Sequence, residues 1–147
     1  LFPDADEYLR EPIPPLMLVE GALPVTLASL ARTRAQMLIW VTCGCGRSQE
    51  AVALADGWQA TWPQVGVRLI STLSPDVTER MFPGERSWLF DVDGQALRSL
   101  GRGADPVAVL LGADGLLAGG PVWGLAEVRD LGDAIAEQLA AEAAPAR

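Results

Sequence analysis

Residues 37–50 read MLIWVTCGCGRSQE. The stretch opens with a continuous apolar run at residues 37–41, which is typical of a β-strand buried on both faces of a sheet. Cys43 and Cys45 follow this run and are the only two cysteines in the chain. A segment with the periodicity of a helix begins directly after them. The sequence therefore predicts a central strand, a short loop that carries both thiols, and a helix.

The rest of the chain continues this alternation of strand-like and helix-like segments. Strands are predicted at residues 16–19, 23–27, 65–70, 88–92, 107–111 and 116–118, and helices at 47–62, 75–81, 95–100 and 125–139. The first two strands form an N-terminal hairpin. Residues 113–115 form the turn of a second hairpin, and the chain leaves this hairpin at Gly119, Gly120 and Pro121. The order of segments predicts an α/β domain with a central mixed β-sheet flanked by helices.

The chain of 147 residues is long enough for one domain with a sizeable core. We expect the acidic, proline-containing residues 1–15 to form a linker or extended arm. Residues 16–140 should form the domain, and residues 141–147 a frayed C-terminal tail. The sequence begins with Leu1 rather than Met, and we expect a leader or membrane anchor to precede it in the full-length protein.

The composition excludes several classes of function. A net charge of −8 is opposite to the basic surface that nucleic-acid binding needs. The chain has no His, so histidine bases and the usual histidine-containing zinc sites are excluded. It also has no Lys, which excludes Schiff-base chemistry.

The position of the two cysteines favours redox chemistry. The free N–H groups at the start of a helix, together with the nearby charge of Arg47, should lower the pKa of an adjacent thiol, and the thiolate is the species that attacks a disulfide. Gly44 allows the backbone to turn tightly enough for Cys43 and Cys45 to pair. A ring that closes over one residue is small, which favours a strained and easily reduced disulfide.

Two stretches resemble proteins of the thioredoxin fold. MLIWVTCGCGRSQE is similar to their strand, active-site loop and helix, and residues 98–121, RSLGRGADPVAVLLGADGLLAGGP, are similar to their second landmark. The closest resemblance is to the extracytoplasmic thiol-disulfide oxidoreductases of cytochrome c maturation and of methylamine utilisation. It extends over residues 16–139. It implies that Pro106 follows a cis peptide bond and lies in a loop beside the cysteines that receives an extended segment of a partner protein.

The sequence departs from the family pattern at four positions. The family has C-x-x-C, whereas here Cys45 is shifted inward by one residue and Gly46 stands at the position of the second cysteine. Thr42 replaces a tryptophan that often precedes the first cysteine. Asp105 precedes the proline, where relatives carry an apolar residue or Thr. A carboxylate that faces the thiols would raise their pKa, or it could accept a proton from them.

The resemblance implies a thiol-disulfide oxidoreductase that acts on protein thiols or disulfides, with Cys43 and Cys45 as its redox pair. Thr42, Gly44, Gly46, Arg47, Asp105 and Pro106 would support the pair or bind the partner. No cofactor is needed because the dithiol holds the electrons, and no metal is expected. The resemblance also implies a location outside the cytoplasm and a membrane tether outside this sequence.

Three alternatives remain open at this point. A purely structural disulfide is a poor explanation because a link across one residue hardly constrains the unfolded chain. Two close thiolates would suit a soft ion such as Cu(I), although Met17, Met37 and Met81 are distant in sequence. The third alternative is a catalytically inactive thioredoxin-fold interaction module of a larger membrane-associated protein, which the altered cysteine spacing favours.

Overall fold

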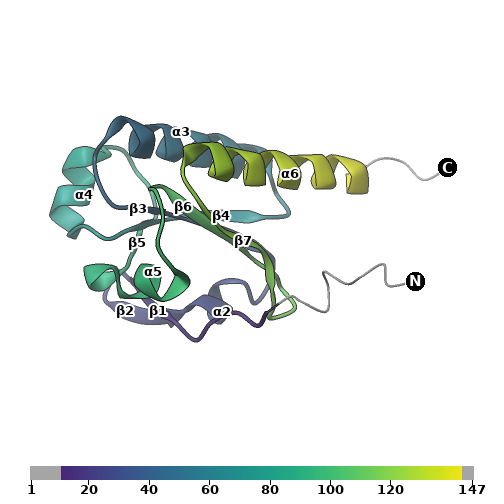
Figure 1. Ribbon diagram of the computed structural model, residues 1–147, viewed down its shortest axis with the longest axis horizontal. Helices are drawn as coiled ribbons and strands as arrows, with labels where there is room; N and C mark the ends of the chain where they lie inside the picture. The colour runs from purple at the N-terminus through teal and green to yellow at the C-terminus, as the bar shows by residue number, and fades with distance from the viewer. Residues whose placement is uncertain (1–10, 144–147) are drawn as a thin grey trace.

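The structure of the chain is a computed structural model, and it describes residues 11–143 (Figure 1). The strands are β1 (Met17–Glu20), β2 (Leu23–Thr26), β3 (Gln36–Val41), β4 (Gly66–Ser71), β5 (Leu89–Phe90), β6 (Val107–Leu111) and β7 (Leu117–Trp123). The helices are α2 (Leu27–Leu30), α3 (Gly46–Thr61), α4 (Pro75–Met81), α5 (Gln95–Leu100) and α6 (Leu125–Ala143), with a 3₁₀ turn, η1 (Val92–Gly94), before α5.

The strands form one mixed sheet in the order β2-β1-β5-β4-β3-β6-β7. Strand β3 pairs in parallel with β4 and antiparallel with β6, and β4 pairs in parallel with β5. The hairpin of β1 and β2 joins the sheet through an antiparallel contact between β1 and β5. The predicted α/β class, the mixed sheet and the N-terminal hairpin are confirmed.

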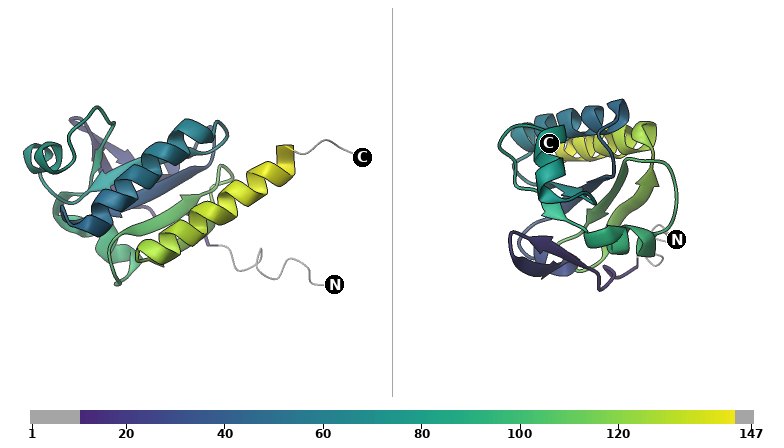
Figure 2. Two further views of the ribbon diagram at one scale, coloured as in Figure 1. Left: turned by 90° about the horizontal axis from the view of Figure 1, so that it is seen from above. Right: turned by 90° about the vertical axis from the view of Figure 1, so that its left-hand side faces the viewer.

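Strand β3 is the centre of the core. All six of its residues are buried, as the continuous apolar run predicts. Because side chains alternate along a strand, Met37, Ile39 and Val41 belong to one hydrophobic cluster, and Leu38 and Trp40 to the other. The first cluster includes residues of α3 and α6, and the second includes residues of α2 and α5. Figures 1 and 2 show α3 and α6 side by side on one face and α5 on the opposite face.

A glycine brings α3 and α6 close together. A Cβ atom at Gly132 of α6 would overlap with the indole ring of Trp58 on α3. Trp58 in turn stacks on Trp62, with 5.3 Å between ring centroids and 6° between the planes. Trp62 belongs to the first core cluster, and Trp58 packs against it.

The second hairpin differs from the prediction. The prediction that Gly119, Gly120 and Pro121 leave the hairpin is wrong, because all three lie inside β7. The pairing of β6 with β7 shifts register between Ala108 and Leu110, which is the mark of a β-bulge. Gly120 has φ +77°, a conformation that glycine adopts without strain. The glycines therefore accommodate a bulge instead of ending the strand, and β7 continues to Trp123.

The ends of the described chain pack on the sheet or extend from it. Pro12 forms a bridge with Leu116, and the neighbouring Ile13 is buried. At the other end α6 continues to Ala143, so residues 141–143 of the expected frayed tail are helical. The remaining residues of the predicted arm and tail, 1–10 and 144–147, lie outside the described residues. The domain boundaries stay a prediction.

Asp91 links the sheet to the start of α5. It is 2% exposed, and its carboxylate accepts hydrogen bonds from the Trp40 indole N–H at 3.0 Å and from the backbone N–H groups of Ala96 and Leu97 at 2.9 Å each. A buried acceptor that satisfies three donors fixes the position of α5 against β3.

Replacing Asp91 with Ala should therefore destabilise the fold. The Asp91→Ala variant leaves these three donors without their acceptor, and we expect the free energy of unfolding to fall by about 3 kcal/mol. Urea denaturation followed by circular dichroism measures the change. Asp133→Ala, at an exposed position of α6, is the control, and its free energy of unfolding should stay within about 0.5 kcal/mol of the parent. A loss no larger than in this control would show that the carboxylate does not hold α5.

Candidate active site

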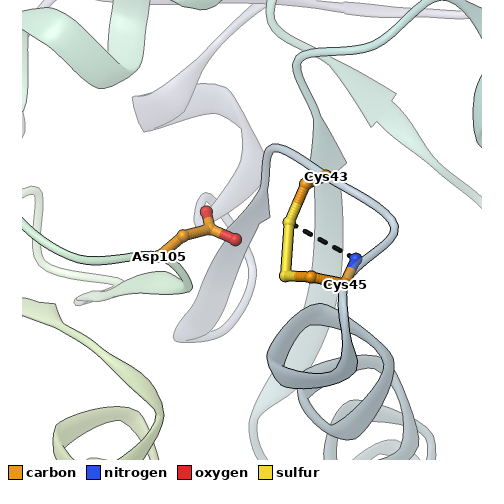
Figure 3. Close-up of side chains that lie close together, drawn as sticks. All are labelled: Cys43, Cys45 and Asp105. Carbon is orange, nitrogen blue, oxygen red and sulfur yellow. Dashed lines mark hydrogen bonds between the residues drawn. A yellow bond between two sulfur atoms is a disulfide. The ribbon is translucent and has the colours of Figure 1, made fainter.

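Cys43 and Cys45 lie in the loop between β3 and α3, where the sequence predicts them. They are joined by a disulfide, with their Cα atoms 5.5 Å apart (Figure 3). Both residues are partly exposed. The loop begins after Val41, the last residue of β3, and it ends at Cys45, the N-cap of α3.

The start of α3 supplies positive electrostatic potential to the loop. Cys45 makes no side-chain cap, and its carbonyl accepts the first bond of the helix from the Gln49 N–H at 3.0 Å. The preceding N–H groups of the first turn therefore have no partner within the helix, and they carry the positive end of its dipole. The Cys45 N–H also donates to Cys43 Sγ at 3.4 Å (Figure 3). This arrangement stabilises a thiolate on Cys43 when the disulfide is open.

The loop before β6 places a carboxylate beside the sulfur atoms. The peptide bond between Asp105 and Pro106 is cis, and Pro106 is buried. The side chain of Asp105 points towards the disulfide (Figure 3). Its nearest oxygen and the two Sγ atoms all lie within 4.8 Å of one another. Asp105, Pro106, Cys43 and Cys45 are thus brought together in the way that the sequence predicts.

Ser48 is the residue of this site that the sequence analysis misses. It lies in the first turn of α3 and its side chain is completely buried. Its hydroxyl donates to Asp105 Oδ2 at 2.8 Å and lies 3.5 Å from Cys43 Sγ and 3.6 Å from Cys45 Sγ. The spacing offered a signal: a residue three positions after an N-cap faces back towards it, which is the geometry of a capping box.

The other predicted positions have different roles. A Cβ atom at Gly44 would overlap with Sδ of Met81 at the end of α4, so a larger residue there requires the exposed Met81 side chain to move. At Gly46 a Cβ would meet nothing within 4 Å. Thr42 is partly buried, and Arg47 is exposed. In the described part of the chain, Arg47 makes no hydrogen bond or ion pair with either cysteine.

Three side chains of the site form a potential set of metal ligands. Cys43, Cys45 and Asp105 offer two sulfurs and one oxygen at a spacing that a single ion could bridge. Such binding requires both cysteines as thiolates, and in the disulfide form neither sulfur carries that charge. The oxidised site therefore does not fit a metal.

No protein-family model and no curated protein matches the sequence. Solved structures do match. A putative thiol:disulfide interchange protein DsbE from Chlorobium tepidum superposes with a TM-score of 0.69 at 20% identity, over 90% of this chain and 95% of that one.

Two further structures match over similar lengths. The thioredoxin domain of a thiol-disulfide oxidoreductase from Bacteroides vulgatus gives a TM-score of 0.66 at 11% identity, over 86% of this chain and 94% of that one. StoA from Bacillus subtilis gives 0.57 at 12% identity, over 81% and 98%.

The chain has the thioredoxin fold. The superpositions cover most of each protein. Within the thioredoxin fold, the loop of Cys43 and Cys45 and the loop of Pro106 meet at one edge of the sheet, as the resemblance implies.

The contact between Gly44 and Met81 can be tested by a double-mutant cycle. Gly44→Ala forces the two side chains apart, and we expect the oxidised protein to lose about 1 kcal/mol of unfolding free energy. Met81→Ala removes the obstacle, so the double variant should be more stable than the sum of the single effects predicts by at least about 0.5 kcal/mol. Gly46→Ala, with open space around its Cβ, is the matched control and should cost nothing. Additive effects of the two single substitutions would contradict the contact.

Proposed function

We propose that the protein is a thiol-disulfide oxidoreductase that acts on the cysteines of other proteins through Cys43 and Cys45. The observation that carries this proposal is the pair of sulfur atoms at the start of α3, partly exposed and contacted by a backbone N–H, a buried hydroxyl and a carboxylate. A structural cross-link needs none of these groups around it.

The two cysteines have separate roles in this proposal. Cys43 is the nucleophile because the N–H of Cys45 points at its sulfur and stabilises the thiolate. In the reducing direction it attacks a partner disulfide and releases one partner thiolate. Cys45 then attacks Cys43 Sγ, which forms the internal disulfide and releases the second thiolate. The protein dithiol loses two electrons and two protons, and the partner disulfide gains them.

The loop of Asp105 and Pro106 supports this chemistry. Asp105 is the acid that exchanges protons with the cysteines, since its carboxylate faces both sulfur atoms. Pro106 and its neighbours form the ledge on which an extended segment of the partner lies. Thr42, Gly44, Gly46 and Arg47 shape or polarise the loop. The redox pair itself holds the electrons, so the reaction requires no cofactor.

Structural neighbours support the reaction class and suggest the compartment. Two of them are described as thiol:disulfide interchange proteins, and another is an exposed lipoprotein thioredoxin from Streptococcus pneumoniae. By analogy, the protein works outside the cytoplasm and is tethered to a membrane through sequence beyond this chain. Within residues 11–143, no helix is long and apolar enough to cross a membrane.

A second function is favoured by the cysteine spacing. Only one residue separates Cys43 from Cys45, so the domain could bind partners without exchanging disulfides. The two functions differ in whether the disulfide opens and closes under native conditions.

A redox titration decides between them. The protein is equilibrated in glutathione buffers of defined potential, its free thiols are alkylated, and the tryptic peptide of residues 35–47, which holds both cysteines, is weighed. An oxidoreductase gives a reversible two-electron transition within the range of cellular dithiols, between about −120 and −300 mV. A disulfide that stays closed over this range would leave a binding module.

Single serine variants test the assignment of roles. With a model disulfide substrate, Cys43→Ser should reduce exchange to the uncatalysed background because the nucleophile is absent. Cys45→Ser keeps the nucleophile, so it should accumulate a mixed disulfide between Cys43 and the substrate. Mass spectrometry under non-reducing conditions detects this adduct. If Cys45→Ser were inert and Cys43→Ser formed the adduct, the order of attack would be the reverse.

A further inference from the structure

The hydroxyl of Ser48 is placed between the sulfur atoms and the carboxylate. It is fully buried, although polar side chains rarely are. Asp105 Oδ2 lies 2.8 Å from Ser48 Oγ, and the two Sγ atoms lie at 3.5 and 3.6 Å. A serine hydroxyl has one proton to donate and two lone pairs with which to accept. Since its proton is donated to Asp105, only its lone pairs face the sulfur atoms.

The disulfide form lacks donors for these acceptors. Neither sulfur of a disulfide carries a proton, so the lone pairs of Ser48 receive no hydrogen bond from them. Asp105 Oδ1 is likewise buried without a hydrogen-bond partner among the described residues. Buried acceptors without donors are uncommon and call for an explanation. Reduction of the disulfide lets a sulfur atom carry a proton, and an S–H group beside Ser48 supplies a donor to its hydroxyl oxygen.

The two sulfur atoms are not equivalent towards these acceptors. Cys43 Sγ already accepts the N–H of Cys45 at 3.4 Å, an interaction that suits a thiolate. In the described part of the chain, Cys45 Sγ has no such backbone donor. Among the described residues, the polar atom in contact with Cys45 Sγ is Ser48 Oγ, which is an acceptor. When the reduced pair carries a single proton, that proton is therefore on Cys45, which can donate it to Ser48.

We propose that Ser48 is a proton relay for Cys45: it accepts the thiol proton of Cys45 at Oγ while it passes its own proton to Asp105 Oδ2. This assignment rests on the proposed oxidoreductase function and adds a residue to it. The transfer leaves Cys45 as a thiolate and Asp105 protonated, with Ser48 unchanged. In the oxidising direction the same path returns a proton to Cys45 as it leaves the disulfide.

The aromatic disulfide dithiobis(nitrobenzoate) separates the two chemical steps. Cys43 attacks it and releases one yellow nitrothiobenzoate, which leaves a mixed disulfide on Cys43. Cys45 loses its proton to Ser48, attacks Cys43 Sγ and releases the second nitrothiobenzoate. The reagent gains the two electrons that the protein dithiol loses. Stopped-flow absorbance thus records a first phase that depends on reagent concentration and a second phase that does not.

The relay predicts a distinct pH dependence of the second phase. In Ser48→Ala the thiol of Cys45 must lose its proton to solvent, so the second phase should slow about 10- to 100-fold at about pH 6. The effect should disappear at about pH 9, where a free thiol ionises unaided. The first phase should change less than about threefold, since Cys43 does not use the relay.

The charged surroundings of the relay are simple. The titratable groups brought to the Asp105 carboxylate are the two cysteines. Arg47 on α3 and Arg102 on the loop before β6 are exposed. Glu50, one turn further along α3, is paired with Arg129 of α6. The pH profile of the second phase therefore reports on the transfer of the Cys45 proton.

Two further variants distinguish a relay from a structural role. Asp105→Asn removes the proton acceptor, and if both residues act in one path, the Ser48→Ala/Asp105→Asn double variant should be no slower than the slower single variant. Ser71→Ala deletes another fully buried serine hydroxyl, which bonds to Thr78. This control should lower stability and leave both phases unchanged.

The outcomes separate the relay from the proposed function. A parent protein that releases nitrothiobenzoate in two phases while Ser48→Ala is unaffected at about pH 6 would overturn the relay and leave the oxidoreductase standing. Equal slowing of both phases at every pH would also overturn it. If the parent forms no internal disulfide with the reagent, the proposed function itself fails.

Discussion

The antiparallel pairing of β3 with β6 is the constraint on which the site depends. The last pair in the register joins Trp40 to Val107. Because the strands run in opposite directions, the residues that follow Trp40 and those that precede Val107 leave the sheet at the same edge. The loop of Cys43 and Cys45 therefore meets the loop of Asp105 and Pro106. A change of register by one residue would turn every buried side chain of β3 to the other face, so the core also fixes this encounter.

Burial of β3 on both faces makes that register hard to change. Leu38 and Trp40 pack towards α2 and α5, while Met37, Ile39 and Val41 pack towards α3 and α6. The start of α3 is consequently held at the end of the strand that precedes it, and the turn between them is short. Asp91 adds a polar link on the other side, because its carboxylate joins Trp40 of β3 to the first N–H groups of α5. Rigid elements of the core thus support both loops of the site.

Sequence patterns predict the local features of this arrangement and miss the ones that depend on distant contacts. The buried run of β3 and the helix at residues 75–81 are visible as residue types and spacings, and the structure has them. The glycines of β7 were misjudged because a bulge inside a strand and the end of a strand use the same residue. The contact of Met81 with Gly44 joins a helix end to a loop far away in sequence. A role for Ser48 can be inferred only from the fold, which brings Asp105 next to it.

Two opposing electrostatic influences act on the pair of thiols. The first turn of α3 favours a thiolate, and the carboxylate of Asp105 disfavours one. The N–H of Cys45 donates to Cys43 Sγ, whereas the hydroxyl of Ser48 lies 3.5 Å from Cys43 Sγ and 3.6 Å from Cys45 Sγ and donates to the carboxylate. In the proposed mechanism Cys43 attacks, and Cys45 keeps its proton until the mixed disulfide has formed.

The burial of Asp105 Oδ1 bears on the choice between an enzyme and a binding module. Burying a carboxylate oxygen without a donor costs free energy of folding, and a binding surface gains nothing from such an atom beneath it. In the proposed relay this carboxylate becomes protonated when Cys45 attacks, so the charge that makes its burial costly is removed in one half of the redox cycle. Strain or unsatisfied polar groups that persist in a folded protein concentrate at sites that do chemistry. The buried oxygen therefore favours a pair of cysteines that opens and closes over one that only holds a loop.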